Sequence, residues 1–326
     1  MKAAWYEKNG SARETLIVGE LPTPEPGPGE VRVKISVSGV NPSDVKSRRG
    51  RPLNAPRIIP HSDAGGVIDA VGPGVSASRI GERVWIWNGQ WQRPMGTAAE
   101  YIALPEAQAV TLPDNCDFAA AACLGIPALT AYEAVRLLGD IQGKTILLIG
   151  AASSVAHYAA QFAALKGAKI IGTVSSDEKA RHALAAGVNE TINYKTEPVA
   201  QRVKEMTGQR GVDAIIDMDF SSTVNLVREG ALIPHGKIVC YGSNSMDDVL
   251  IPFRPMLMNS MQLLFFLVYD LTAEQRQEGL AEIGKLLASG RLTHTIGARY
   301  SLDDIAAAHE AVEGGRVMGN VVVDIG

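Results

Sequence analysis

The chain has 326 residues, 20% of them charged, and its formal net charge at pH 7 is −4. This near balance, without a run of basic residues, argues against a protein that follows a nucleic-acid backbone. The longest apolar stretch, residues 256–268, is interrupted by polar residues and is too short to span a bilayer. The three cysteines are far apart and odd in number, which is typical of the reducing cytoplasm and offers no metal-binding spacing.

Roughly the first 110 residues are predicted to be rich in β-strands. Apolar runs separated by Gly and Pro give strand candidates at residues 3–6, 16–20, 31–40, 65–71, 83–87 and 99–104. Prolines at positions 22, 24, 26 and 28 form an extended connector before the third candidate. This pattern favours a small irregular barrel over a parallel sheet.

The rest of the chain alternates between strands and helices. Strands are predicted at residues 145–149, 169–174, 190–193, 212–217 and 237–241, and helices at 154–166, 177–186, 199–207 and 222–230. Such alternation predicts a parallel sheet with helices on both faces. A last strand at 263–268 is an option, followed by helices at 273–289 and 302–313 and a closing strand at 320–324.

The stretch at residues 143–174 combines a short strand, a turn of small residues, a helix and a second strand. This is the pattern of a dinucleotide-binding βαβ unit, and another doubly wound α/β domain is the alternative. We expect a substrate-binding domain at residues 1–122, a nucleotide-binding domain at 123–262, and a segment at 263–326 that adds an edge strand and returns to the first domain. A cleft between the domains is the expected ligand site.

Several blocks, in this order and spacing, resemble the medium-chain dehydrogenase/reductase superfamily. They read PxPxPGPGEVRVKISVSGVNPSD, IPHSDAGGVIDAVGPGV, GERVW, TAAEYIALP and LGIPALTAYEAV, followed by the βαβ unit. Within the superfamily the chain is most similar to the zinc-free quinone oxidoreductases, the zeta-crystallin group. The resemblance implies an α/β protein with a GroES-like irregular β-barrel, a Rossmann domain, bound NADPH and hydride transfer to a quinone.

The same resemblance allows a test for zinc. Zinc-dependent members place a cysteine ligand near Asn41 and a His-Glu pair where Ser62 and Asp63 stand, and here neither the thiolate nor the imidazole is present. His61 lies one position early, so a structural role is expected for it. We therefore expect no metal. Without a Lewis acid, a quinone or an activated alkene is a more suitable acceptor than a simple carbonyl.

The turn of the βαβ unit departs from the family pattern. Relatives usually carry glycines where this chain has Ser153, Ser154 and Ala156. Ser153 is a candidate helix cap whose neighbouring amides face a phosphate, with Ala152 and Val155 beside it. Serine at a position with φ above zero would be strained, so weakened NADPH binding is an expectation that follows from these replacements.

The end of the second strand favours NADPH over NADH. An NAD enzyme usually places an acid there, whereas this chain has Ser175, with Lys179 one helical turn further on. Tyr194 matches the position where quinone reductases close the adenosine pocket. Asp177, at the start of the next helix, is a mild counter-argument.

The resemblance implies further cofactor contacts. Asn41 and Thr130 are expected near the nicotinamide end, and Lys46, another expected cofactor contact, stands where relatives often have an aromatic residue. Gly242, Ser243 and Asn244 are expected to cross over the cofactor, and Phe266, Leu267 and Val268 to offer backbone groups to the carboxamide. Asn320 replaces a frequent lysine of the family, which leaves Arg316 as the cation of that segment.

The substrate side is less defined, and no catalytic residue emerges. Asn41, Lys46, Trp87 and Trp91 are candidates for the cleft, with core packing as the alternative for the tryptophans and the expected role of Trp85. Arg48, Arg49, Arg51 and Arg93 are candidates to bind an anionic acceptor, with exposed solubilising charges as the alternative. Residues 47–56 contain no tyrosine, which argues against enoyl thioester reduction with a tyrosine proton donor.

Three functions follow from this interpretation. The first is NADPH-dependent reduction of a quinone, and the second is reduction of an activated C=C bond in an enone or a 2-substituted acrylate. The third, of another class, is an NADPH-binding structural or regulatory protein with little turnover. We also expect a homodimer, because the apolar strand near residue 263 can form an uncovered sheet edge.

Overall fold

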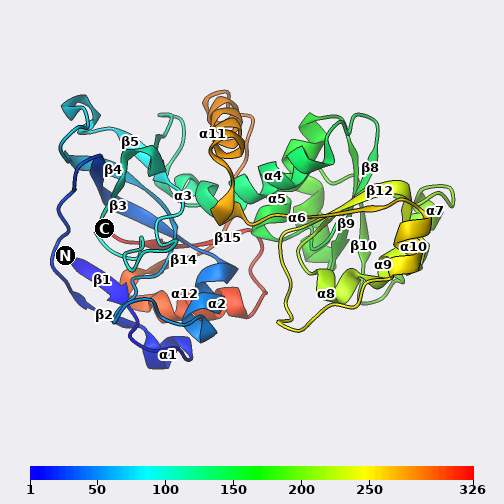
Figure 1. Ribbon diagram of the computed structural model, residues 1–326, viewed down its shortest axis with the longest axis horizontal. Helices are drawn as coiled ribbons and strands as arrows, with labels where there is room; N and C mark the ends of the chain where they lie inside the picture. The colour runs from blue at the N-terminus through cyan, green and yellow to red at the C-terminus, as the bar shows by residue number, and fades with distance from the viewer. The chain divides into compact units, whose positions relative to one another are not determined.

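The computed structural model describes residues 1–326, which divide into two compact units (Figure 1). The first unit consists of residues 1–129 and 280–326, and the second of residues 130–279. The chain thus leaves the first unit once and returns to it. The division expected from the sequence, at residues 122 and 262, remains a prediction of where the domains end.

The first unit is built on antiparallel strands. Its main sheet has the order β14 (Ile296–Ser301), β15 (Asn320–Asp324), β3 (Glu30–Val40), β4 (Asp63–Val71), β5 (Arg83–Ile86) and β7 (Ala109–Thr111), and β6 (Tyr101–Pro105) also pairs with β3. A small second sheet pairs β1 (Lys2–Trp5) with β2 (Ile17–Glu20). Only β14 and β15 run parallel. All six strands predicted for this part of the chain are present.

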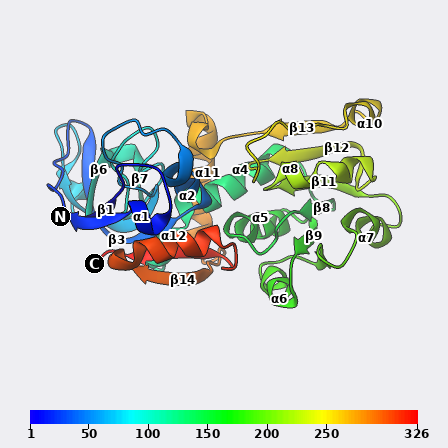
Figure 2. The same cartoon turned by 90° about the horizontal axis from the view of Figure 1, so that it is seen from below.

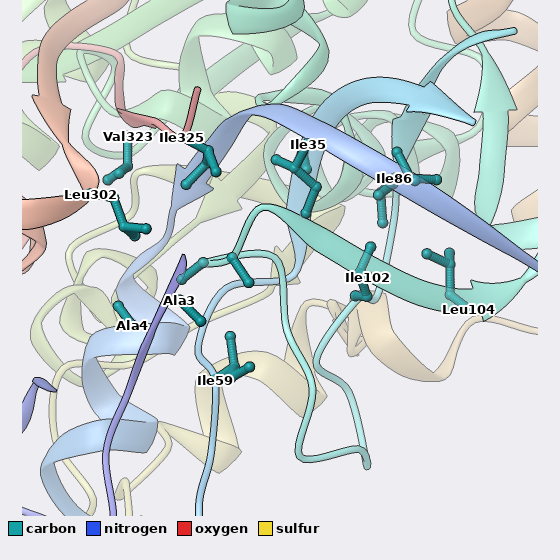
Figure 3. Packing of buried hydrophobic residues seen from close by; sticks show 14 of the residues in the cluster. Ala3, Ala4, Ile35, Ile59, Ile86, Ile102, Leu104, Leu302, Val323 and Ile325 are labelled. Carbon is teal, nitrogen blue, oxygen red and sulfur yellow. The ribbon is translucent and has the colours of Figure 1, made fainter. Parts of the chain in front are cut away.

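Apolar side chains at alternate positions of these strands form the core of the first unit (Figure 3). Ile35 of β3 and Ile102 and Leu104 of β6 are at most 2% exposed. Leu302 and Val323, from the far end of the chain, pack in the same cluster. Because burying one such side chain contributes roughly 1.5–3 kcal/mol, the C-terminal residues are an integral part of this unit.

Short helices cover the sheet. They are α1 (Ala12–Thr15), α2 (Pro42–Gly50), α3 (Phe118–Ala121) and α12 (Ile305–Glu313), with a π-helical turn at Leu124–Ala128. In Figures 1 and 2, α12 lies beside α2. Helix α2 was not predicted from the sequence, because its residues show no apolar periodicity. Asn41 is its N-cap residue and Pro42 its first residue, and Asp44 accepts a hydrogen bond from the Asn41 backbone N–H at 2.7 Å.

The second unit contains a parallel sheet, as the sequence predicts. Its order is β10 (Glu190–Asn193), β9 (Lys169–Val174), β8 (Thr145–Leu148), β11 (Val212–Asp217), β12 (Leu232–Cys240) and β13 (Gln262–Phe265), and all neighbours are parallel. The order reverses between β8 and β11, which is the switch point of a doubly wound fold. β12 starts earlier than predicted, because Leu232 pairs with Val212 before an irregularity in register.

Helices connect these strands. They are α5 (Ser154–Leu165), α6 (Asp177–Ala185), α7 (Val199–Met206), α8 (Phe220–Thr223), α9 (Asn225–Arg228) and α10 (Phe253–Met258). α4 (Leu129–Leu138) precedes β8, and α11 (Ala273–Ala288) follows β13 and contains the division between the two units. Helices α5 and α6 contact β9, and α6 and α7 contact β10 (Figure 2). The single helix predicted at 222–230 is two short helices. None of the helices combines the length and the apolar character that crossing a bilayer demands.

Candidate functional site

The predicted cofactor residues of the second unit share one edge of its sheet. Each group directly follows the carboxyl end of a strand: Ala152, Ser153, Ser154 and Val155 after β8, Ser175 after β9, Tyr194 after β10, Gly242, Ser243 and Asn244 after β12, and Phe266, Leu267 and Val268 after β13. In open parallel sheets, ligands bind outside the carboxyl ends of the strands, near the switch point. The fold therefore brings these positions to the edge where a dinucleotide is expected.

The turn after β8 is not strained by its serines. Ser153 has φ −77° and caps α5, its hydroxyl accepting a hydrogen bond from the Ala156 N–H at 3.4 Å. The left-handed position belongs to Gly150, with φ +67°, and a Cβ there would lie 2.4 Å from the Met218 sulfur. Its N–H donates to the Thr173 hydroxyl at 2.9 Å. The sequence-based expectation of strain at the serines was wrong, because the conformation that requires glycine occurs before them.

Replacing Ser153 by alanine is accordingly expected to loosen the turn. We expect the free energy of unfolding to fall by about 1 kcal/mol, because the first turn of α5 loses its cap. NADPH should then bind several-fold more weakly in a fluorescence titration. Ser301→Ala removes a similar cap in the first unit, where the Ser301 hydroxyl accepts from the Asp304 N–H at 3.3 Å, and serves as the control. Tighter NADPH binding by Ser153→Gly would contradict this interpretation and restore the strain hypothesis.

The ends of β9 and β10 carry the residues predicted to bind the adenosine ribose. Asn193 of β10 pairs with Val174 of β9, and the Tyr194 N–H donates to the Val174 carbonyl at 3.0 Å, so these strand ends are adjacent. Tyr194 is 52% exposed, Ser175 and Lys179 are half-buried, and no acidic residue ends β9. The Ser176 hydroxyl accepts from the Lys179 N–H at 3.3 Å, which fixes the start of α6. The site thus offers hydroxyl groups and the Lys179 ammonium, beside the acidic Asp177 and Glu178 in the first turn of α6.

A cavity of about 320 Å³ lies between the ends of β12 and β13. Gly242, Ser243 and Phe266 line it together with Tyr241, Cys240 and apolar residues. Burial raises the pKa of the Cys240 thiol to about 12, so this cysteine is unreactive at neutral pH. Asp219, which the sequence analysis missed, accepts from the N–H and the side-chain amide of Asn244, at 2.8 and 2.9 Å, and so holds the loop after β12.

Two further observations concern the predicted nicotinamide end. The Thr130 hydroxyl is buried and makes no hydrogen bond within the chain. Val268 is buried, and the Arg276 guanidinium donates to the Val268 and Tyr269 carbonyls at 3.1 and 3.2 Å. Because a buried hydroxyl rarely stays without a partner, Thr130 fits a position that contacts a ligand. Arg276 is a residue of α11 that sequence reasoning missed.

In the first unit, Asn41 and Asp63 come together. The Asn41 side-chain amide donates to Asp63 Oδ2 at 2.8 Å, and both side chains are buried. Burial raises the pKa of Asp63 well above its usual value and that of Asp44 to about 7, so both carboxyls keep their proton to a higher pH than an exposed aspartate does. Asn41 and Asp63 stand where zinc-dependent members of the superfamily are expected to have zinc-site residues. The two positions are thus neighbours, but here they hold an amide and a carboxyl group.

A buried chain of hydrogen bonds leads from this cluster to the surface. Thr97 Oγ1 lies 2.8 Å from the Asp63 carbonyl, Ser38 Oγ 2.8 Å from Thr97, His61 Nδ1 2.9 Å from Ser38, and His309 Nε2 3.0 Å from His61 Nε2. Arg48 then donates from Nε to His309 Nδ1 at 3.4 Å and pairs with Glu313 and the Gly10 carbonyl. His61 therefore has the structural role expected from the sequence.

The groups at the two ends of this hydrogen-bond chain, Arg48 and the Asp63 carbonyl, determine where each of its protons lies. Arg48 can only donate, so His309 Nδ1 accepts and His309 Nε2 carries the proton. His61 then accepts at Nε2 and donates from Nδ1 to Ser38, and the hydroxyls pass the direction on to the Asp63 carbonyl. Burial lowers the pKa of His61 to about 3 and that of His309 well below its usual value, so both imidazoles are neutral. No group of three or more His, Cys, Asp or Glu side chains is arranged to hold a metal ion.

A second cavity, of about 310 Å³, lies in the first unit beside the end of α2. It is lined by Tyr6, Ser47, Arg51, Pro52, Leu53, Asn54, Ile58, Gln90, Trp91 and Gln92. Of the two alternatives for Trp91, a cleft position or core packing, its place in the lining of this cavity favours the first. Trp87 does not line it and donates from its indole N–H to the Ala107 carbonyl at 3.1 Å, whereas Trp85 is fully buried, as expected.

The remaining candidates lie elsewhere. Lys46 and Arg316 are exposed. Asn320 is buried in β15, where its backbone and side-chain N–H groups donate to the Thr295 carbonyl at 2.9 and 3.0 Å. Among the four arginines, Arg51 alone lines the cavity, while Arg48 belongs to the buried chain and Arg93 donates to the Gly89 and Ala103 carbonyls.

Comparison with known proteins defines the class of this chain. Residues 27–114 match the family model of the alcohol dehydrogenase GroES-like domain, and residues 186–323 match the model of a zinc-binding dehydrogenase. The quinone oxidoreductase of Pseudomonas aeruginosa is 32% identical, covering 92% of both chains. The 2-haloacrylate reductase of a Burkholderia species is 29% identical, covering 99% of this chain and 98% of that protein.

Solved structures agree with this class. The crystal structure of an NAD-dependent alcohol dehydrogenase is 32% identical, with a TM-score of 0.90 and 100% of both chains covered. That of the Escherichia coli quinone oxidoreductase complexed with NADPH is 26% identical, with a TM-score of 0.87 and the same coverage. The chain is therefore a medium-chain dehydrogenase/reductase with a GroES-like and a Rossmann part. Within this superfamily it belongs to the quinone oxidoreductase group.

Proposed function

We propose that this protein is an NADPH-dependent oxidoreductase that transfers hydride to a quinone without a metal ion. The observation that carries the proposal is the set of residues at the carboxyl ends of β8, β9 and β10. An unstrained turn caps the N-terminus of α5, and Ser175 and Lys179 occupy the place where an NAD enzyme usually has an acid. The quinone oxidoreductases among its relatives, and the E. coli structure with NADPH, support it.

The residues present fit this cofactor. The N–H groups at the start of α5 and the Ser153 hydroxyl are suited to the pyrophosphate, and Lys179 with Ser175 to a 2′-phosphate. The unpartnered Thr130 hydroxyl is suited to a polar group of the nicotinamide end. When bound, NADPH supplies the hydride. The task of the protein is then to bind, orient and exclude water, because hydride transfer depends on alignment more than on an acid–base pair.

The proposal extends to the missing metal. Asn41 and Asp63 hydrogen-bond each other where relatives hold zinc, and His61 is occupied by Ser38 and His309. The family model that matches residues 186–323 is described as a zinc-binding dehydrogenase, and the proposal departs from that description. Elemental analysis of the purified protein is expected to find no stoichiometric zinc, and activity should survive a chelator. One zinc per chain, with activity lost on its removal, would contradict the zinc-free assignment.

An acceptor panel tests the function. We expect loss of NADPH absorbance at 340 nm with quinones, and a kcat/KM at least tenfold higher with NADPH than with NADH, because a cation and hydroxyls replace the acid that binds the 2′-hydroxyl. Equal use of both cofactors would contradict the assignment of Ser175 and Lys179. The likeness to an NAD-dependent alcohol dehydrogenase makes an alcohol with NAD⁺ a necessary member of the panel.

Reduction of an activated C=C bond is the second candidate. It is supported by the likeness to a 2-haloacrylate reductase and by the single arginine that lines the cavity of the first unit. Turnover of 2-chloroacrylate or an enone, with quinones inactive, would favour it. The third candidate, a binding protein without turnover, loses the support that came from the serines of the turn, because Ser153 is unstrained.

We further propose a homodimer in the cytoplasm. Phe265 of the edge strand β13 and Leu267 beyond it are 66% and 50% exposed, which favours a sheet edge that a second copy covers. All three cysteines are unbridged, in agreement with a reducing compartment. A monomer in light scattering would contradict the dimer.

A further inference from the structure

The cavity beside the end of α2 contains one charge and no acid. Of its lining residues, Arg51 is the only one that is charged, and Trp91 is the largest aromatic. We propose that this cavity binds a planar acceptor that carries a carboxylate or a similar anionic group, which Arg51 holds while the other lining residues contact the ring. That the bound molecule accepts hydride rests on the proposed function. Its binding can be tested without turnover.

Arg51 differs from the neighbouring buried arginine because its guanidinium makes no ion pair. Arg48 is fully buried and paired with Glu313, whereas Arg51 is exposed and has no carboxylate within 4.0 Å. Only its backbone is used for structure: the Arg51 N–H donates to the Ser47 carbonyl at 3.1 Å and ends α2. The side chain therefore keeps its donors for a ligand, and a guanidinium presents them in the fork that matches a carboxylate.

Trp91 orients this guanidinium. The central carbon of the Arg51 guanidinium lies 5.6 Å from the centre of the Trp91 ring, within the range of a cation–π contact. This contact places the cation over the aromatic ring, at the wall of the cavity that both residues line. The N–H groups of the guanidinium remain available to an anion in the cavity.

The loop that carries Trp91 is held by its own hydrogen bonds. Arg93 donates to the Gly89 carbonyl at 2.6 Å, and the Gln90 side chain donates to the Arg93 carbonyl at 2.9 Å. Asn88 and Gln92, on either side, have φ of +51° and +59°. Asparagine adopts this conformation readily and glutamine less so, and the hydrogen bonds within the loop hold both residues in it.

The same loop connects the cavity to the predicted reaction centre. The Gly89 N–H donates to the Ser62 carbonyl at 2.9 Å, and the Gln90 N–H contacts the Ser62 hydroxyl at 3.4 Å. Ser62 precedes Asp63, the partner of Asn41 at the start of α2, and Ser47 of the same helix lines the cavity. The contacts between the cavity and Asn41 therefore run through Gln90, Ser62 and Asp63. A volume of about 310 Å³ suits a molecule of one or two rings.

A binding experiment with two unreactive probes tests this inference. The probes are 2-naphthoate and its neutral counterpart 2-naphthamide, and calorimetry measures their dissociation constants on the intact protein. We expect the wild type to bind the carboxylate about tenfold more tightly than the amide, because the guanidinium–carboxylate hydrogen bonds are charge-assisted. Arg51→Gln should abolish this preference, and Trp91→Ala should weaken both probes. Arg49→Gln, which removes an exposed charge two positions away, is the control and should change neither.

The outcomes separate the two hypotheses. No preference for the carboxylate in the wild type, or a preference that Arg51→Gln retains or that Arg49→Gln abolishes equally, would overturn the inference. Kinetics with NADPH then compare 2-chloroacrylate with its methyl ester, and menadione with the same variants. If menadione is reduced by wild type and by Arg51→Gln alike, the proposed function holds whatever the probes show. If no acceptor is reduced but the carboxylate preference follows Arg51, the cavity is an anion-binding site and the proposed function fails.

Discussion

Replacing Arg48 by alanine is expected to lower the free energy of unfolding by about 3–5 kcal/mol, because it breaks a buried ion pair from one side. The Arg48 side chain is fully buried and pairs with Glu313, which lies 265 residues further along the chain. It also donates to the Gly10 carbonyl and to His309. The variant would leave these acceptors without a donor and open a void between α2 and α12.

Urea unfolding of Arg48→Ala and Arg49→Ala measures this effect. Arg49 is its exposed neighbour on the same helix, so the control is expected to change the free energy of unfolding by less than about 0.5 kcal/mol. Arg48→Met fills most of the space without the charge and separates packing from pairing. Equal, small effects of Arg48→Ala and Arg49→Ala would show that the buried chain does not stabilise the first unit.

The second large effect concerns pH. The chain from Arg48 through His309 and His61 to the Asp63 carbonyl has no free acceptor, so an additional proton must break one of its hydrogen bonds. His61 has a pKa of about 3 when folded, against 6.5 for an ordinary histidine. Below pH 6.5, His61 therefore binds a proton in the unfolded state but not in the folded state. His61 alone should lower the free energy of unfolding by about 3 kcal/mol at pH 4.5 relative to pH 7.

Neighbouring groups change stability in the opposite direction. Asp44, with a pKa of about 7, and Asp63, whose pKa burial also raises, are protonated in the folded state at pH values where the unfolded state has lost the proton. Their contribution is present at low pH and lost as pH rises through the folded pKa. His309, whose pKa burial also lowers, adds to the effect of His61. The pH dependence of the wild type is therefore a difference of opposing contributions.

A comparison with His61→Asn isolates the contribution of His61. Asparagine does not titrate and tolerates the left-handed backbone, φ +75°, that His61 adopts. The variant is expected to be less stable than wild type at pH 7, because the hydrogen-bond chain is broken. The gap should narrow by about 3 kcal/mol on lowering the pH to 4.5. A gap that is the same at both pH values, in urea unfolding, would contradict the neutral imidazole pair.

The parallel sheet and its edge could be predicted from the sequence because both depend on local patterns. The strands at 169–174, 190–193 and 320–324 were predicted at their observed bounds. Residues that follow strands, such as Ser175 and Tyr194, reach the same edge once the strands are parallel. Helix α2 was not predicted because its interior lacks apolar periodicity. Only the capping residues at its start indicate a helix.

Contacts between distant residues could not be predicted. His61 and His309 are 248 positions apart, and nothing near either residue indicates the other. The serine turn shows a different limit. A motif states which residues stand in the turn, but only the backbone shows that Gly150, and not Ser153, takes the left-handed conformation. Arg51 was one of four equivalent candidates until the structure showed which arginine lines a cavity.

Hydride transfer from NADPH is the central claim, and one anaerobic mixing experiment tests it most directly. The protein is combined with one equivalent of NADPH, and then with excess menadione in a stopped-flow spectrometer. We expect the absorbance at 340 nm to disappear in a single turnover that requires the protein, and to do so far more slowly with NADH. An unchanged absorbance with menadione, although NADPH is bound, would contradict quinone reduction by this protein.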